Sequence, residues 1–306
     1  MSAPAAVQPA VQASVYALTH AGSRRGENQD SFLVADLCVP PAEGPWRVST
    51  DRDDAPEPRR FDVGPRGLLA VVADGMGGAA AGALASRLAV AEIYGAMATH
   101  WAAEPQPTHG RFARSLRGAV EAANAALHRH AGREPACAGM GTTATVAGIL
   151  DGFLFLAQVG DSRAYLVRGG RAVQITRDQS LVQQLMDAGA LTSDEAERSG
   201  LSSVLLQALG PAPRVEVDLT RQEVRRGDVL VLCSDGLSRT VPPAEIARAA
   251  ARAPDAAAFC AALVGAAIAG GGPDNVTVVA AVLDGPGLTH PRDEDAVGRL
   301  PYPAGA

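Results

Sequence analysis

Three aspartates lie where an apolar stretch of the sequence meets glycine or asparagine. They are Asp74 after the run 68–73, Asp235 after the run 229–233, and Asp274 before the run 275–283. Each run predicts a buried strand, and the rigid end of a strand would fix the position of its carboxylate. One such aspartate alone commonly caps a turn, but three favour a shared polar site. Hard cations are the usual reason for proteins to gather carboxylates.

Two more carboxylates and an arginine extend this candidate site. Asp30 and Asp161 lie at junctions between loops and predicted strands, and Arg25 lies in the same loop as Asp30. Five carboxylates brought together would repel one another, raising their pKa values and destabilising the fold. Divalent cations would remove this repulsion, and the planar fork of Arg25 suits a phosphate group.

Composition excludes several classes of function. The chain of 306 residues has 27 basic and 33 acidic residues, a net charge of −6, and no basic run. This argues against a nucleic-acid-binding or anionic-membrane surface. The sequence has no lysine, which rules out lysine nucleophiles and Schiff bases. It also lacks a Gly-x-Ser-x-Gly elbow, so no serine nucleophile of that kind is indicated.

The cysteines and the apolar segments bear on compartment. Cys38, Cys137, Cys233 and Cys260 form no CxxC pair and are interpreted as reduced thiols in a cytoplasmic protein. Residues 1–13 lack the basic region of a signal peptide. The most apolar segment, 256–269, is too short to span a bilayer. A monomer is the default expectation.

The remaining pattern predicts an α+β fold. Short glycine-containing connections link four predicted strands into antiparallel hairpins, at 142–150, 153–159, 163–168 and 171–176. Further strands are expected at 15–19, 31–38, 68–73, 214–220, 229–233 and 275–283. Helices are expected at 79–101, 111–130, 181–188, 243–252 and 255–269. Strands in hairpin runs and helices in pairs fit α+β better than alternating βαβ units.

The predicted domain organisation is a single domain over residues 14–284. Disordered tails are expected at 1–13 and 285–306, because both stretches lack periodic apolar residues. Residues 39–66, rich in proline and charge, are interpreted as a loop insertion. Residues 178–210 are polar and mixed, and predict a flap over the sheet.

Six short motifs, in this order, make the sequence resemble a bacterial metal-dependent serine/threonine phosphatase of type 2C. They are Gly22-x-x-Arg25-x-x-Asn28-Gln29-Asp30, Asp74-Gly-Met-Gly-Gly78, Gly141-Thr-Thr143, Gly160-Asp-Ser-Arg163, Ser234-Asp-Gly236 and Asp274-Asn275. Each motif alone is weak, but six in the correct order and spacing are specific. The resemblance runs from about residue 15 to 283.

The resemblance implies a fold and a set of metal ligands. The fold would be an antiparallel β-sandwich with helices on both sides, in four layers. Two core Mn2+ or Mg2+ ions would be bridged by Asp74, with Asp235 and Asp274 completing one site and the Gly75 carbonyl and, through water, Asp30 serving the other. A third, weaker ion would bind Asp161, near the flap residue Ser203. Arg25 would bind the substrate phosphate.

The implied reaction is direct attack on phosphoserine or phosphothreonine by a water that bridges the two metals. The expected partners are phosphorylated proteins, namely a serine/threonine kinase and its substrates, or an anti-sigma-factor antagonist. A catalytically silent phosphatase fold that only recognises or regulates a partner is the alternative. The complete set of Arg25, Asp74, Asp235 and Asp274 favours catalysis. Two departures stand out: Gln29 replaces a common glutamate, and Met76, which cannot donate a proton, replaces a histidine of eukaryotic relatives.

Overall fold

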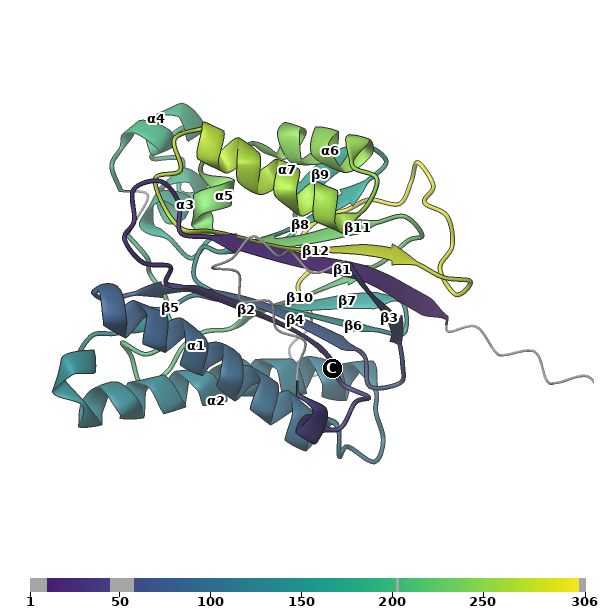
Figure 1. The fold of residues 1–306 in the computed structure, drawn as a ribbon, viewed down its shortest axis with the longest axis horizontal. Coiled ribbons are helices and arrows are strands. Elements are labelled where there is room, and N and C mark those ends of the chain that lie inside the picture. The colour runs from purple at the N-terminus through teal and green to yellow at the C-terminus, as the bar shows by residue number, and fades with distance from the viewer. Residues whose placement is uncertain (1–9, 45–57, 202–203, 303–306) are drawn as a thin grey trace, which may run out of the picture.

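Two antiparallel sheets lie face to face in the computed structural model, which describes residues 10–44, 58–201 and 204–302 (Figure 1). The first sheet has the order β3 (Arg59–Val63), β1 (Val11–His20), β12 (Val276–Asp284), β11 (Val229–Cys233), β8 (Arg163–Arg168), β9 (Arg171–Gln174). The second has the order β10 (Asp218–Glu223), β7 (Phe153–Val159), β6 (Ala144–Leu150), β4 (Leu68–Met76), β2 (Asp30–Asp36), and the short β5 (Gly141–Thr142) also pairs with β4.

Helices cover the outer face of each sheet (Figure 1). The second sheet carries α1 (Ala79–Ala96), continued by a π-helical segment (Met97–Trp101), and α2 (His109–Arg133), whereas the first carries α6 (Pro243–Arg252) and α7 (Ala256–Ala269). The shorter helices are α3 (Leu181–Asp187), α4 (Ser193–Arg198) and α5 (Asp235–Ser238), with 3-10 turns at Pro41–Glu43 and Pro135–Cys137. The predicted α+β class is confirmed, and this arrangement is consistent with four layers.

Three apolar clusters hold the layers together. Phe112, Leu116 and their neighbours fill the space between the second sheet and its helices. A second cluster, which includes Val72 and Val279, lies between the two sheets. The third packs α7 on the first sheet through Phe259. Among the described residues, no helix has both the length and the apolar character needed to cross a bilayer.

Strand β4 is the scaffold of the site. It lies between β2 and β6, and residues 68–73 are buried on both faces. A strand covered on both sides reads as a continuous apolar run rather than an alternating one, which is why this segment is so clear in the sequence.

The predicted domain boundaries need correction at both ends. Residues 11–13 belong to β1 rather than to a tail, with Val11 and Ala13 buried. Residues 285–302 lie against the sandwich: Leu288 joins the cluster between the sheets, and the Tyr302 backbone N–H donates to the Leu219 carbonyl over 2.8 Å. These few anchors are too widely spaced to form a periodic pattern, so composition alone indicated a tail.

The predicted insertion 39–66 also contains regular structure. Residues 59–63 form the edge strand β3, which pairs with β1 and buries Phe61. Residues 45–57 lie outside the described part of the chain. The predicted strands at 171–176 and 214–220 correspond to Arg171–Gln174 and Asp218–Glu223.

Candidate active site

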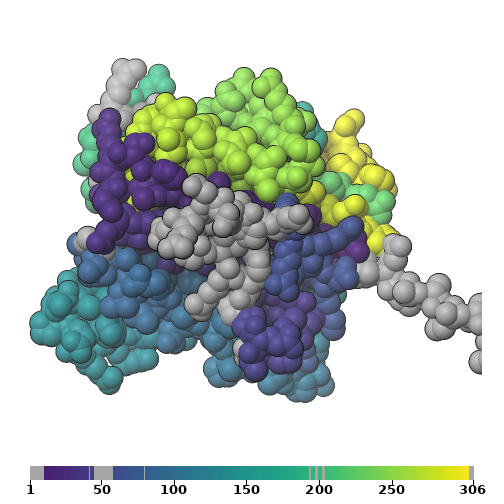
Figure 2. Space-filling view, in the orientation of Figure 1, coloured from purple at the N-terminus to yellow at the C-terminus, as the bar shows by residue number. Residues whose placement is uncertain are grey.

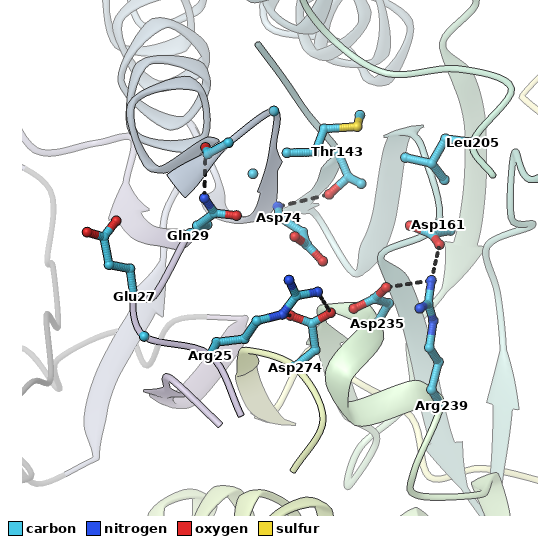
Figure 3. A pocket seen from close by; sticks show the side chains of 15 residues that line it. Arg25, Glu27, Gln29, Asp74, Thr143, Asp161, Leu205, Asp235, Arg239 and Asp274 are labelled. Carbon is cyan, nitrogen blue, oxygen red and sulfur yellow. Dashed lines mark hydrogen bonds and ion pairs between the residues drawn. The ribbon is translucent and has the colours of Figure 1, made fainter. Parts of the chain in front are cut away.

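The predicted carboxylates come together at one end of the sandwich. Asp74, Asp161, Asp235 and Asp274 line one pocket of about 440 Å3, together with Arg25 and Gly75 (Figure 3). The loop 21–29, which carries Arg25, lies at this end between α7 and α1 (Figure 2). Asp30 is buried beside the pocket, opposite Asp74 in the pairing of β2 with β4. Ser203 lies outside the described residues.

The backbone of Asp74 is held by two threonines from the neighbouring strand. The Asp74 N–H donates to Thr143 Oγ1 over 2.9 Å, and the Asp74 carbonyl accepts from Thr142 Oγ1 and from the Thr143 N–H, over 2.8 and 2.9 Å. Both threonines are buried. Because these hydrogen bonds use only the backbone of Asp74, its carboxylate can point into the pocket (Figure 3).

The glycines after Asp74 serve two different purposes. Gly77 and Gly78 have φ of 106° and 69°, which side chains rarely adopt. Gly75 has no such φ, but a Cβ there would lie 2.1 Å from the Gly82 carbonyl oxygen of α1. Glycine at 75 therefore allows α1 to pack directly against the end of β4.

Asp30 is a buried carboxylate with one satisfied and one unsatisfied oxygen. Its Oδ2 accepts from Ser234 Oγ and Thr277 Oγ1, each over 2.6 Å. Its Oδ1 is buried and has no hydrogen-bond partner in the described structure. Burial raises the pKa of Asp30 to about 7, against the two hydrogen bonds, which lower it.

The pKa values of Asp74, Asp161 and Asp235 are also raised. Burial, reinforced by the charges of neighbouring aspartates, raises the pKa of Asp74 well above its ordinary value. Burial also raises the pKa of Asp235, although Arg239 opposes the shift, and it raises the pKa of Asp161 to about 7. The cluster thus has too little positive charge for its acidic groups.

Two arginines supply the positive charge that the structure does contain. Arg25 donates two hydrogen bonds to Asp274: its Nε donates to Oδ1 over 2.8 Å, and its Nη2 donates to Oδ2 over 2.7 Å. Arg239 Nη2 lies 2.6 Å from Asp235 Oδ2 and 3.4 Å from Asp161 Oδ2 (Figure 3). With the carboxylates turned this way, no three acidic, histidine or cysteine side chains of the described residues form a ready metal-binding group.

The donor chemistry nevertheless fits hard divalent cations. The candidate ligands are all oxygen atoms, and Asp30 Oδ1 and Asp235 Oδ1 are buried without a partner among the described residues. Buried carboxylates are usually paired or bind a metal. Arg25, whose side chain is 56% exposed, pairs with both oxygens of Asp274, and Asp274 Oδ1 also accepts from the Asn275 N–H over 2.9 Å.

Sequence reasoning assigned no structural role to several residues that build the site. Asn275 anchors the loop of Arg25, because its Oδ1 accepts from the Gln29 N–H and its Nδ2 donates to the carbonyls of Ala21 and Glu27. Arg239 follows Asp235 by four residues, and this helical spacing was the one available signal for its pairing. Gln29 donates from Nε2 to the Gly78 carbonyl over 3.0 Å, a structural role.

Comparison with known proteins places this fold and site in one family. Residues 47–266 match the family described as protein phosphatase 2C. The serine/threonine protein phosphatase PstP of Mycobacterium tuberculosis is 43% identical over 213 residues, 70% of this chain and 40% of PstP. The protein phosphatase PhpP of Streptococcus pneumoniae is 35% identical over 210 residues, 69% of this chain and 83% of PhpP. The chain belongs to the protein phosphatase 2C family.

A solved structure adds information about metals. The catalytic domain of PstP in complex with two manganese ions has a TM-score of 0.70 and 34% identity, covering 90% of this chain and 99% of that chain. The present chain spans only 40% of the length of full PstP, so the likeness concerns its catalytic domain.

Proposed function

We propose that this chain is a metal-dependent phosphatase that hydrolyses phosphoserine and phosphothreonine in proteins. The observation that carries the proposal is the convergence of four carboxylates and Arg25 on one pocket, in a member of a phosphatase family. The relatives PstP and PhpP are named as protein phosphatases, which supports proteins as the class of substrate.

In this proposal Mn2+ or Mg2+ is held by the acidic cluster. Asp74 would hold both core ions, Asp235 and Asp274 would complete one site, and the Gly75 carbonyl and, through water, Asp30 would serve the other. The proposed number of core ions is the same as in the PstP catalytic domain, whose structure was solved in complex with two manganese ions. When bound, such ions supply positive charge and lower the pKa of a water molecule towards neutrality. The resemblance also implies a third ion at Asp161 and Ser203, but the proposed function needs only the two core ions.

Arg25 is proposed to bind the phosphate of the substrate. Its guanidinium already makes a bidentate pair with a carboxylate, and phosphate offers oxygens in the same geometry. Because its side chain is 56% exposed, it can exchange Asp274 for substrate at little cost in burial. The exchange would leave Asp274 available for a cation, so phosphate binding and metal binding support each other.

The proposed partners are phosphoproteins, including a serine/threonine kinase and its targets. The alternative is a silent fold that binds phosphoproteins without hydrolysis. The four pocket carboxylates and Arg25 support catalysis, since a binding module would need only the arginine.

The test is hydrolysis of p-nitrophenyl phosphate and of phosphoserine, phosphothreonine and phosphotyrosine peptides by EDTA-stripped protein, with and without Mn2+. We expect Mn2+-dependent release of phosphate from the first three substrates and little from phosphotyrosine. Asp74→Asn, checked for folding by circular dichroism, serves as the inactive control. Folded wild-type protein that binds phosphopeptide but releases no phosphate with Mn2+ or Mg2+ would establish the silent alternative instead.

A further inference from the structure

A second arginine, Arg239, stands in the pocket on the side away from Arg25 (Figure 3). It follows the short helix α5, whose first residue is Asp235, and its backbone N–H donates to the Asp235 carbonyl over 2.9 Å. Its position is therefore set by the same turn that positions a candidate metal ligand. The guanidinium lies between two acidic groups, 2.6 Å from Asp235 and 3.4 Å from Asp161.

The two oxygens of Asp235 have different surroundings. Oδ2 is paired with Arg239, whereas Oδ1 is buried and has no hydrogen-bond partner in the described structure. A cation can therefore bind Oδ1 while Arg239 keeps Oδ2. Arg239 need not leave when a core ion binds.

Arg239 differs in this respect from Arg25. Arg25 occupies both oxygens of Asp274 and is 56% exposed, whereas Arg239 is 32% exposed and takes one oxygen of each partner. Its partners are also more buried, since the side chains of Asp161 and Asp235 are only 9% and 12% exposed. A buried carboxylate that loses its counter-charge strongly destabilises the folded protein. The folded state therefore favours Arg239 in its place between the two carboxylates.

We propose that Arg239 is a tethered cation that neutralises Asp161 and orients Asp235, so that the site takes two divalent ions and none at Asp161. The proposal rests on the proposed function, because it assumes the two core ions. The guanidinium group carries a positive charge, and the position of Arg239 directly after α5 holds that charge beside both carboxylates. An ion at Asp161 would have to bind beside this guanidinium, which lies 3.4 Å from Asp161 Oδ2 and whose positive charge repels a second cation. Arg239 thus acts as a positioning residue for Asp235.

The experiment counts bound Mn2+ by isothermal titration calorimetry and by equilibrium dialysis with elemental analysis. EDTA-stripped wild type, Arg239→Ala and Arg239→Ala with Asp161→Asn are compared. We expect two ions in wild type, a third and weaker ion in Arg239→Ala, and two again in the double variant. Arg248→Ala is the matched control, because Arg248 pairs with Glu245 on the exposed face of α6, and it should keep two ions.

The outcomes separate this inference from the proposed function. Wild type that binds no Mn2+ overturns both, whereas wild type with a third ion that Asp161→Asn removes overturns only the role of Arg239. A count of two in folded Arg239→Ala also overturns that role. If Arg239→Ala does not fold, the wild-type count still decides whether a third ion binds, and Arg239→Gln, whose side chain is shorter and polar but uncharged, replaces Arg239→Ala.

A second readout is the melting temperature of metal-free protein. Arg239→Ala should lower it more than Arg248→Ala does, because two buried carboxylates lose their cation. Saturating Mn2+ should restore more of the melting temperature in Arg239→Ala than in the Arg248→Ala control. If the melting temperature fell equally in metal-free Arg239→Ala and Arg248→Ala, the proposed role of Arg239 as a counter-charge would be contradicted.

Discussion

At the scale of single residues, the acidic groups of the pocket divide into those held by the backbone and those held by charge. Asp74 is positioned through the hydrogen bonds of its peptide groups to Thr142 and Thr143. Asp274 and Asp235 are positioned by Arg25 and Arg239. A carboxylate held through its backbone keeps its place whether or not an ion is bound, whereas Asp274 can exchange the exposed Arg25 for another partner.

Asp235→Asn tests the metal assignment. The amide keeps the volume of the side chain but lacks the charge that a hard cation needs. We expect kcat to fall by about 10²–10³-fold, as for other losses of a charge-stabilising group, with the circular dichroism spectrum unchanged. Full activity in this variant would show that Asp235 is not a ligand.

Arg25→Ala tests the phosphate-binding assignment. Hydrogen bonds to charged groups contribute about 1.5–3 kcal/mol, so KM should rise by about 10–100-fold. Because Arg25 also competes for Asp274, the Kd for Mn2+ should not increase. Steady-state kinetics and calorimetry measure the two constants. An unchanged KM with weakened Mn2+ binding would assign Arg25 to the metal site instead.

At the scale of elements, the close contact between β4 and α1 fixes the rim of the pocket. The helix can approach because neither Gly75 nor Gly82 has a side chain at the crossing. The loop 21–29 is tied to the opposite side by Asn275, which precedes β12. The pocket is thus built from the ends of elements that belong to different sheets.

Gly75→Ala tests this packing. Its Cβ would meet the Gly82 carbonyl oxygen at 2.1 Å and the Gln29 carbonyl oxygen at 2.8 Å, so backbone must move. We expect a loss of about 1–3 kcal/mol in the free energy of unfolding, as for other overpacked sites. Gly95→Ala, in helix α1, would have nothing within 4 Å of its Cβ and should gain about 0.5–1 kcal/mol in the free energy of unfolding. Urea denaturation measures the free energy of unfolding of both variants. Equal changes in Gly75→Ala and Gly95→Ala would contradict the close contact between Gly75 and Gly82.

At the scale of the whole molecule, the buried acidic cluster couples stability to pH and to metal. Asp30 and Asp161 have pKa values of about 7 in the folded protein, against an ordinary 3.8. Between these values the folded state binds more protons than the unfolded state, so stability falls as pH rises. The fold therefore carries an electrostatic cost at neutral pH that cations would offset.

The metal-free protein should accordingly melt at a higher temperature near pH 5 than near pH 8. Saturating Mn2+ at pH 8 should raise the melting temperature, because bound cations neutralise the carboxylates. Differential scanning calorimetry with EDTA or Mn2+ measures both effects. A metal-free protein more stable at pH 8 than at pH 5 would contradict the raised pKa values.

The sequence by itself determined the apolar strands and the aspartates at their ends, because a strand buried on both faces is a continuous apolar run that stops at the polar residue. Of the predicted hairpins, β6–β7 and β8–β9 form, but the predicted hairpin between 153–159 and 163–168 is wrong, because the connection at 160–161 crosses from the second sheet to the first. Only the tertiary structure decided that 285–302 packs on the sandwich, that Gly75 is required by Gly82, and that Arg239 stands between Asp235 and Asp161. These features depend on contacts between segments far apart in the chain or on side-chain direction, neither of which leaves a local pattern.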